Sequence, residues 1–130
     1  VAWRLKSRID EGTDSFRAMN ECQDHLLALA RAHGERIVLE RFRAAVDQAK
    51  TSEEAEIADS LSLLADLYGL SRLERDRAWF QESGYMEGGQ GKAVRGLVNA
   101  LCADLRPFAV QLVDAFGIPD EILAAPDAIT

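Results

Sequence analysis

Two histidines and the acidic residues near them are the first candidates for chemistry in this chain. His25 follows Asp24 directly and stands four residues after Glu21, while His33 stands two residues before Glu35. Carboxylate and imidazole groups bind divalent metals, and di-iron helical bundles use Glu-x-x-His pairs that project inward. No Glu-x-x-His occurs in the sequence. We therefore predict no metal site and interpret both histidines as helix-surface or interface residues.

The two cysteines are the only candidate thiol nucleophiles. Cys22 stands three residues before His25, which is close enough for contact on one helix. A cysteine nucleophile also needs an oxyanion site, and the sequence offers no such arrangement and no Ser/His/Asp set. A disulfide between Cys22 and Cys102 stays possible, although secreted disulfide scaffolds carry more cysteines. We favour two buried thiols that act as small hydrophobic residues.

The glycine-rich segment 83–92 is superficially similar to a phosphate-binding loop. A P-loop has the pattern Gly-x-x-x-x-Gly-Lys-Ser/Thr and follows a strand. Here Gly91 and Lys92 are followed by Ala93, and no strand is predicted before them. We interpret residues 82–91 as a mobile loop between helices.

The remaining candidates have structural interpretations. The acidic pair Glu53-Glu54 follows Thr51-Ser52 at a predicted helix start, where the helix dipole favours negative charge. The aromatic pair Trp79-Phe80 is expected to pack in a core or an interface. We therefore assign no catalytic residue in this chain, and any residues that bind a cofactor stay unknown.

Composition excludes several classes of partner. The 130 residues contain 15 Lys and Arg against 22 Asp and Glu, for a net charge of −7. A protein surface that binds nucleic acid or an anionic membrane needs concentrated basic charge, so we expect neither partner. No apolar run approaches the ~20 residues that span a bilayer, and no signal peptide is visible. The chain begins Val1-Ala2-Trp3 without methionine, so we expect a fragment of a longer protein.

Helical periodicity dominates the elements that must position these residues. Apolar residues recur at spacings of three, four and seven, with no strand alternation. The predicted helices are 1–9, 16–49, 53–80 and 92–116, with a short final helix at 119–124. We expect 1–130 to form a single helical domain of the all-α class. Its architecture should be an antiparallel helical bundle, because short loops make sequence neighbours spatial neighbours.

Glycine, proline and capping residues mark the ends and bends of these helices. Gly12 marks the first turn, and Thr13 or Asp14 is the expected cap of the second helix. Proline inside a helix removes one hydrogen bond, so Pro107 predicts a kink in the helix 92–116. Gly117 is the expected C-terminal cap of the same helix. Two further glycines lie inside predicted helices. Close helix approach is the expected role of Gly34, and a bend or a helix division is expected at Gly69.

Several of these strings occur together in one known family. They are Cys22-Gln23-Asp24-His25-Leu26-Leu27, Ala30-Arg31-Ala32-His33, Leu67-Tyr68-Gly69-Leu70, Leu105-Arg106-Pro107, and Leu112-Val113-Asp114-Ala115-Phe116 with Pro119-Asp120. On these residues the chain resembles the C-terminal helical domain of acyl-CoA oxidases over nearly its whole length. The combination of Leu-Arg-Pro with Leu-Val-Asp-Ala-Phe is the most specific part. Many members continue with a Gly-x-Tyr-Asp-Gly-type segment, which residues 124–130 do not match.

The resemblance implies a larger flavoenzyme of fatty acid β-oxidation. It implies FAD and a fatty acyl-CoA substrate, with a glutamate base that removes the α-proton, hydride transfer to flavin, and peroxide formation with oxygen. The base and most FAD contacts are implied upstream, so this fragment alone is expected to be inactive. The implied partners are the upstream domains and a second copy in a homodimer. The implied compartment is the cytoplasm in bacteria and the peroxisome in eukaryotes. A stand-alone helical interaction module without catalytic activity stays open as the alternative.

Overall fold

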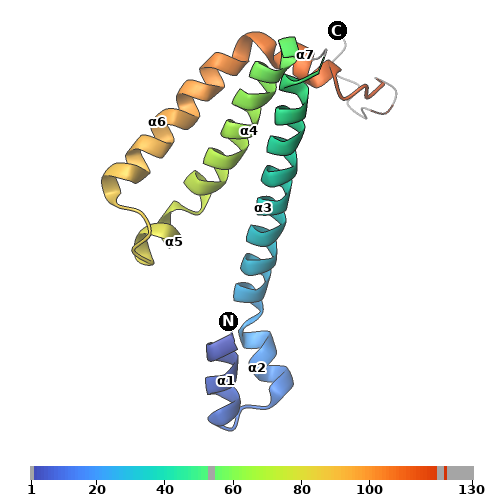
Figure 1. The fold of residues 1–130 in the computed structure, drawn as a ribbon. Helices are drawn as coiled ribbons and strands as arrows, with labels where there is room; N and C mark the ends of the chain where they lie inside the picture. Colours follow the sequence, from blue (N-terminus) through green and yellow to red (C-terminus); the bar gives the residue numbers. More distant parts are fainter. Residues whose placement is uncertain (1, 53–54, 120–121, 123–130) are drawn as a thin grey trace. The chain divides into compact units, whose positions relative to one another are not determined.

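The computed structural model describes residues 2–52, 55–119 and 122 (Figure 1). Its elements are α1 (Ala2–Asp10), α2 (Ser15–Glu21), α3 (Gln23–Lys50), α4 (Ala55–Arg75), α5 (Arg77–Glu82), α6 (Gly88–Leu105), the 3₁₀ helix η1 (Arg106–Phe108) and α7 (Ala109–Asp114). No strand occurs in the described residues, and the predicted all-α helical bundle is confirmed. Contacts group the chain into two compact units, Val1–Ala45 and Val46–Thr130. The single-domain assignment stays a prediction.

The first unit begins with two helices that contact each other. The turn between α1 and α2 contains Gly12, whose φ of 87° lies in the left-handed region that glycine adopts without strain. Asp14 then caps α2, because its carboxylate accepts a hydrogen bond from the Arg17 N–H at 3.2 Å. The turn at Gly12 and the cap at Asp14 are both confirmed.

The long helix predicted over 16–49 is divided at Cys22, so that prediction is wrong. The Cys22 N–H donates to the Met19 carbonyl at 3.1 Å, a tightened turn that ends α2 before α3 begins. The Cys22 side chain is buried at this turn, where it is 1% exposed. Burial of a small apolar group, and not a glycine or proline, accompanies the break. Periodicity alone therefore could not reveal it.

Gly34 lies within continuous helix, as predicted, but it makes no close approach. Nothing in the described part of the chain lies within 4 Å of the point where a β-carbon would stand. Within its own unit no helix packs closely on Gly34, and its role in helix packing stays a prediction.

The second unit is organised around two antiparallel helices. In Figure 1 the chain runs along α4, reverses through α5, and returns along α6 beside α4. Ala58 and Ala65 lie two turns apart on one face of α4, and each is 1% exposed. Small side chains at this spacing allow a helix to be approached closely.

The helix α4 passes through Gly69 without interruption, so the helix division predicted there is wrong. Two contacts span the glycine: the Ser71 hydroxyl donates to the Tyr68 carbonyl at 2.8 Å, and the Arg72 guanidinium lies 4.7 Å from the Tyr68 ring centre. A helical glycine costs only ~1 kcal/mol relative to alanine, which such contacts can offset. The break occurs instead at Asp76, the residue before α5.

Half of the glycine-rich segment is helical, so the predicted loop at 82–91 is correct only for residues 83–87. The Gln90 side chain reaches back to accept a hydrogen bond from the Glu87 N–H at 2.8 Å, as in a capping box, and α6 begins at Gly88. Gly91 is buried in this helix, and an added β-carbon there would stand 2.8 Å from Cδ of Arg77. The connection is therefore only residues 83–87.

The interruption predicted at Pro107 is confirmed. The helix α6 ends at Leu105, η1 contains the proline, and α7 follows. Proline has no N–H to donate and its ring clashes with the carbonyl one turn earlier. Gly117 then ends the segment with a φ of 58°, and its N–H donates to the Asp114 carbonyl at 2.9 Å.

Other predicted helix ends are only partly described. The hydroxyls of Thr51 and Ser52 donate to the Gln48 and Ala49 carbonyls at 2.9 and 3.0 Å, which closes the end of α3. The pair 53–54, predicted to start the next helix, lies outside the described residues. The predicted final helix 119–124 also lies largely outside them.

Candidate functional site

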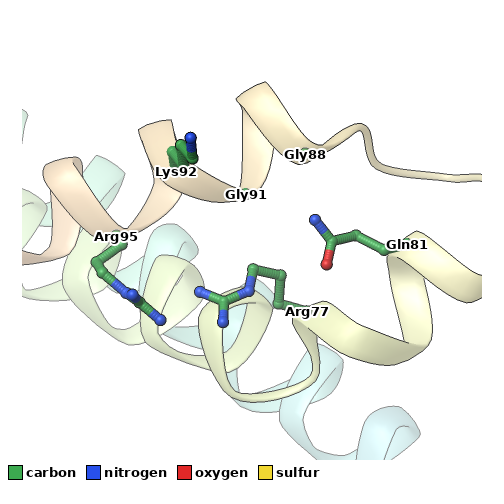
Figure 2. A pocket seen from close by; sticks show the side chains of 6 residues that line it. All are labelled: Arg77, Gln81, Gly88, Gly91, Lys92 and Arg95. Carbon is green, nitrogen blue, oxygen red and sulfur yellow. The ribbon is translucent and has the colours of Figure 1, made fainter.

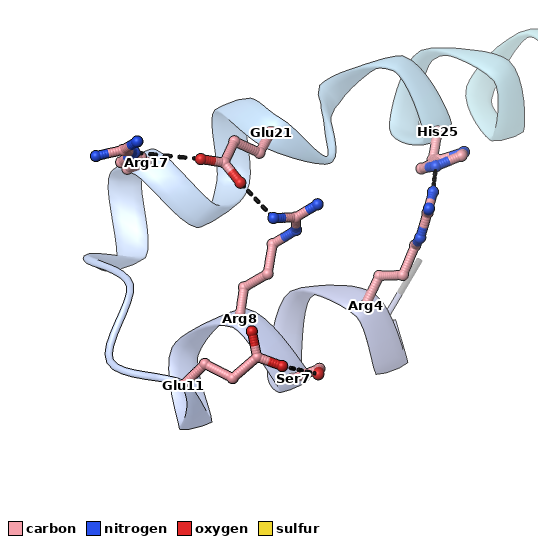
Figure 3. A network of polar contacts seen from close by, with 7 residues as sticks. All are labelled: Arg4, Ser7, Arg8, Glu11, Arg17, Glu21 and His25. Carbon is pink, nitrogen blue, oxygen red and sulfur yellow. Dashed lines mark hydrogen bonds and ion pairs between the residues drawn. The ribbon is translucent and has the colours of Figure 1, made fainter.

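Polar side chains of the first unit join α1 to α2. In Figure 3 the Glu21 carboxylate lies between two arginines, and it forms ion pairs with Arg8 and, at 3.2 Å, with Arg17. The Glu21 side chain is 35% exposed, so water screens both pairs in part. This network fixes two helices to each other and presents no reactive group.

We expect Glu21→Gln to lower the stability of the first unit by less than about 1 kcal/mol, because pairs exposed to this extent contribute little. Thermal unfolding at low and high salt measures the change, which should shrink as salt rises. Glu40→Gln, which removes a single ion pair with Arg36, is the matched control and should have a smaller effect. A loss for Glu21→Gln well above about 1 kcal/mol, or a larger loss for Glu40→Gln than for Glu21→Gln, would contradict this expectation.

The histidine candidates do not assemble a metal site in the part of the chain that the structure describes. His25 receives a hydrogen bond from Arg4 (Figure 3), and its Nε2 lies 3.8 Å from the Asp24 carboxylate. His33 is exposed on α3. No group of three or more His, Cys, Asp or Glu residues in this part could hold a metal ion.

The two cysteines differ in their surroundings. Cys22 is buried, as predicted, whereas Cys102 is exposed, so the prediction of two buried thiols is wrong for Cys102. Both thiols are free. Cys102 lies on α6, a helix whose buried residues are Gly91 and Leu105.

A pocket in the second unit gathers several of its positive charges. This basic pocket has a volume of about 380 Å³ and is lined by Arg77, Gln81, Gly88, Gly91, Lys92 and Arg95. Figure 2 shows the α5 side chains, Arg77 and Gln81, reaching toward the first turns of α6. The close contact of Arg77 with Gly91 holds the arginine stem against α6.

The charges of the basic pocket are only partly neutralised. Nε of Arg95 donates to the Glu74 carboxylate at 3.0 Å. Arg77 and Lys92 have no ion pair within the described residues. The N-terminal end of α6 adds a partial positive charge from its helix dipole, although its N-cap residue is the acidic Glu87. The pocket is thus cationic in a chain whose net charge is −7.

This pocket was not predicted from the sequence. The signal for half of it was present, because Lys92 and Arg95 stand three residues apart and so share one helix face. Arg77 comes from another helix, and only the reversal of the chain after α5 places it beside them. Gly88 and Gly91, two of the glycines that were predicted to form a loop, serve instead as a helical wall of the pocket.

In the aromatic pair Trp79 lies at the surface and Phe80 is half-buried. The Trp79 ring stacks on Tyr85 with centroids 5.9 Å apart and meets Phe80 edge-on at 5.1 Å. Trp79 is 57% exposed, so the structure excludes the core interpretation and leaves the interface interpretation.

Exposed apolar side chains are a further feature of both units. In the first unit Trp3 and Phe16 are 78% and 75% exposed, and in the second Val110 and Val113 of α7 are 72% and 68% exposed. The buried apolar residues of the described chain are few and mostly small: Ala18, Cys22, Val46, Ala49, Ala58, Ala65 and Leu105. Exposed apolar surface of this kind is typical of a protein face that packs against further protein.

These features define a class: an all-α helical domain with apolar faces suited to packing and with a cationic pocket. The sequence model of the acyl-CoA oxidase family matches residues 1–126. The chain therefore belongs to the acyl-CoA oxidase family.

Curated relatives agree with this membership. Acyl-coenzyme A oxidase 2, peroxisomal, from Arabidopsis thaliana is 36% identical over 99% of this chain, and peroxisomal acyl-coenzyme A oxidase 3 from Homo sapiens is 36% identical over 95%. Acyl-coenzyme A oxidase 1 from Yarrowia lipolytica is 29% identical over 85%. The chain spans only 18% of the first two relatives and 15% of the third. No solved structure matches the chain significantly. Within the described residues no helix is both long and apolar enough to cross a membrane.

Proposed function

We propose that this chain is the C-terminal helical domain of an FAD-dependent acyl-CoA oxidase, an enzyme that oxidises fatty acyl-CoA to 2-enoyl-CoA and forms hydrogen peroxide. Its role in this proposal is structural: it covers the catalytic part of the polypeptide and contributes to a homodimer. Family membership supports the proposal, as does the small share of each relative that the chain spans.

The exposed apolar surface carries the structural part of this proposal. Burying an apolar side chain stabilises a protein by roughly 1.5–3 kcal/mol, so a surface with many exposed large apolar groups is costly unless other protein covers it. Phe16, Trp3 and Phe116 each keep more than two thirds of their surface in water here, at 75%, 78% and 77%. We assign the covering surface to the upstream domains, because relatives of the same family continue for more than four fifths of their length beyond the matched region.

The catalytic steps belong elsewhere in this proposal. A base that removes the α-proton of a thioester needs a carboxylate in a site that excludes water. No charged or polar residue of the described chain is buried, so these residues do not fit the reacting end of the flavin. Bound FAD would supply hydride acceptance from the β-carbon and reoxidation by oxygen. We place that chemistry in the upstream domains.

The compartment follows the source organism in this proposal. Two relatives are named as peroxisomal enzymes, and we propose the peroxisome for a eukaryotic source. For a bacterial source we propose the cytoplasm.

We expect the isolated 130-residue chain to show no acyl-CoA oxidation and no tight flavin binding, because its described residues include no buried acid or base to support either. Flavin absorbance after gel filtration and a peroxide assay measure the two properties, with the complete oxidase as the positive control. Turnover by the isolated chain would contradict the structural role. A parent gene without a flavin domain would instead favour the stand-alone interaction module.

A further inference from the structure

We propose that the basic pocket formed by Arg77, Lys92 and Arg95 is a binding site for a phosphate-bearing ligand, recognised through a phosphate or diphosphate group. The inference concerns binding alone and does not depend on the oxidase reaction. It rests on the charge of the pocket, on the shape of its α6 wall, and on its size.

The charge of the pocket selects an anion. Three cationic side chains from two helices line one cavity, and only Arg95 has an acidic partner among the described residues. The Arg77 and Arg95 side chains extend toward each other (Figure 2), and like charges repel one another because the interaction of unit charges falls only slowly with distance. A bound anion relieves that repulsion. A monovalent anion would balance only one charge, whereas a phosphate group supplies about two negative charges at pH 7.

The types of side chain favour phosphate among anions. Arginine presents a planar fork of N–H donors that matches two phosphate oxygens, and lysine supplies a compact point charge. The pocket offers two arginines and one lysine, and the Gln81 amide adds a neutral donor on the α5 side (Figure 2). A carboxylate could occupy one fork, but a diphosphate has enough oxygens for all of these donors.

The wall of the pocket permits close approach to the α6 backbone. Gly88 and Gly91 line it, but the Arg77 and Gln81 side chains already cover the backbone at Gly91, so the open part of the wall is at Gly88. An added β-carbon at Gly88 would meet nothing within 4 Å, so this side of the wall is open. The first amides of α6 add to the attraction for phosphate oxygens, although the capping box already bonds the Gln90 amide and places the Glu87 carboxylate at this end of the helix.

The size of the pocket agrees with a small polar ligand or with one end of a larger ligand. Its volume of about 380 Å³ lies at the lower end of the range for small-molecule sites, roughly 300–1,000 Å³. A diphosphate group fits this space, while a whole dinucleotide would extend into solvent. Both substrate and cofactor of the proposed oxidase carry such groups, and so do free nucleotides.

The direct test titrates the 130-residue chain with inorganic pyrophosphate and follows backbone amide signals by NMR. We expect saturable shifts that centre on Gly88 to Arg95 and that weaken as salt is added. We expect the double variant Arg77→Gln/Lys92→Gln to bind pyrophosphate about tenfold or more weakly, since hydrogen bonds to charged groups are each strong. Arg41→Gln/Lys50→Gln removes two exposed cations outside the pocket and should leave the affinity unchanged.

A single substitution protects the test against misfolding. Arg77 packs against Gly91, so the double variant could lose structure, whereas Lys92 is exposed and its change to Gln should leave the fold intact. Lys92→Gln is expected to weaken binding by about threefold or more. Equal affinity of Lys92→Gln and the control, or amide shifts spread over unrelated basic residues, would overturn the proposal.

Further titrations distinguish the sources of the phosphate. Coenzyme A is compared with its 3′-dephospho form, and both with FAD and ADP. Tighter binding of coenzyme A than of the dephospho form indicates recognition of the 3′-phosphate of an acyl-CoA. Equal binding of FAD and ADP indicates a diphosphate from the flavin or a nucleotide. Pyrophosphate binding with no oxidase in the parent protein would support the pocket and reject the proposed function, so the two can fail separately.

Discussion

Replacing Leu105 with alanine is expected to lower the free energy of unfolding by about 2–5 kcal/mol, a larger loss than truncation of an exposed side chain would cause. Leu105 is 5% exposed and is the largest side chain in the small core of the second unit. Truncation removes most of this side chain and leaves a cavity at the end of α6. Because η1 starts at the next residue and already lacks one helical hydrogen bond at Pro107, little local structure remains to close that cavity.

Leu97 supplies the matched control on the same helix. It is 52% exposed, so Leu97→Ala should cost about 1 kcal/mol or less. Urea unfolding followed by far-ultraviolet circular dichroism gives both values. Similar losses for the two variants would show that the end of α6 is no better packed than its exposed middle, and would contradict the core assignment.

The second large effect concerns docking of α7. When this chain is added in trans to the upstream polypeptide of its parent oxidase, Val110→Ser/Val113→Ser should weaken their association by about thirtyfold, or about 2 kcal/mol. These valines stand three residues apart on α7 and are 72% and 68% exposed in this chain. If the upstream domains cover this face, both side chains become buried in the complex, and hydroxyl groups would then meet an apolar surface.

Isothermal titration calorimetry measures that association. Gln111→Ser, an exposed polar position between the two valines, is the control and should leave the affinity within about twofold. The double serine variant should also keep the unfolding free energy of the isolated chain, since its side chains already face water. Unchanged association would show that α7 is not part of the docking surface. In that case the aromatic cluster around Trp79 or the exposed groups of α1 and α2 become the next candidates for it.

The parts of the fold that were predicted correctly from the sequence depend on local physics. Asp14 caps α2 because a carboxylate beside a helix N-terminus bonds its free amides, and Gly117 ends the last helical segment because it tolerates a positive φ. Pro107 interrupts its helix because it has no N–H. Each effect acts within one turn of the residue that causes it, and so it can be predicted without knowing the fold.

The wrong predictions concern residues whose local preference is weak. The division at Cys22 has no glycine or proline, while Gly69 has a preference against helix that its neighbours offset. The glycine-rich residues 88–91 are typical of a loop, but the Gln90 side chain accepts a hydrogen bond from the Glu87 N–H and so supports the start of a helix. Gly91 also leaves room for the Arg77 side chain to pack against this helix. A preference of ~1 kcal/mol at such positions is small enough for tertiary contacts to reverse.

The sequence by itself determined the helical class, several helix ends, the absence of a Glu-x-x-His metal motif, and membership of the acyl-CoA oxidase family. Only the tertiary structure decided which side chains meet. It buried Cys22 and exposed Cys102, left Trp79 at the surface, and brought Arg77 beside Lys92 and Arg95. The physical reason is the distance over which each effect acts. Periodicity, caps and proline act over a single helical turn, whereas burial and electrostatic potential depend on every element that packs nearby.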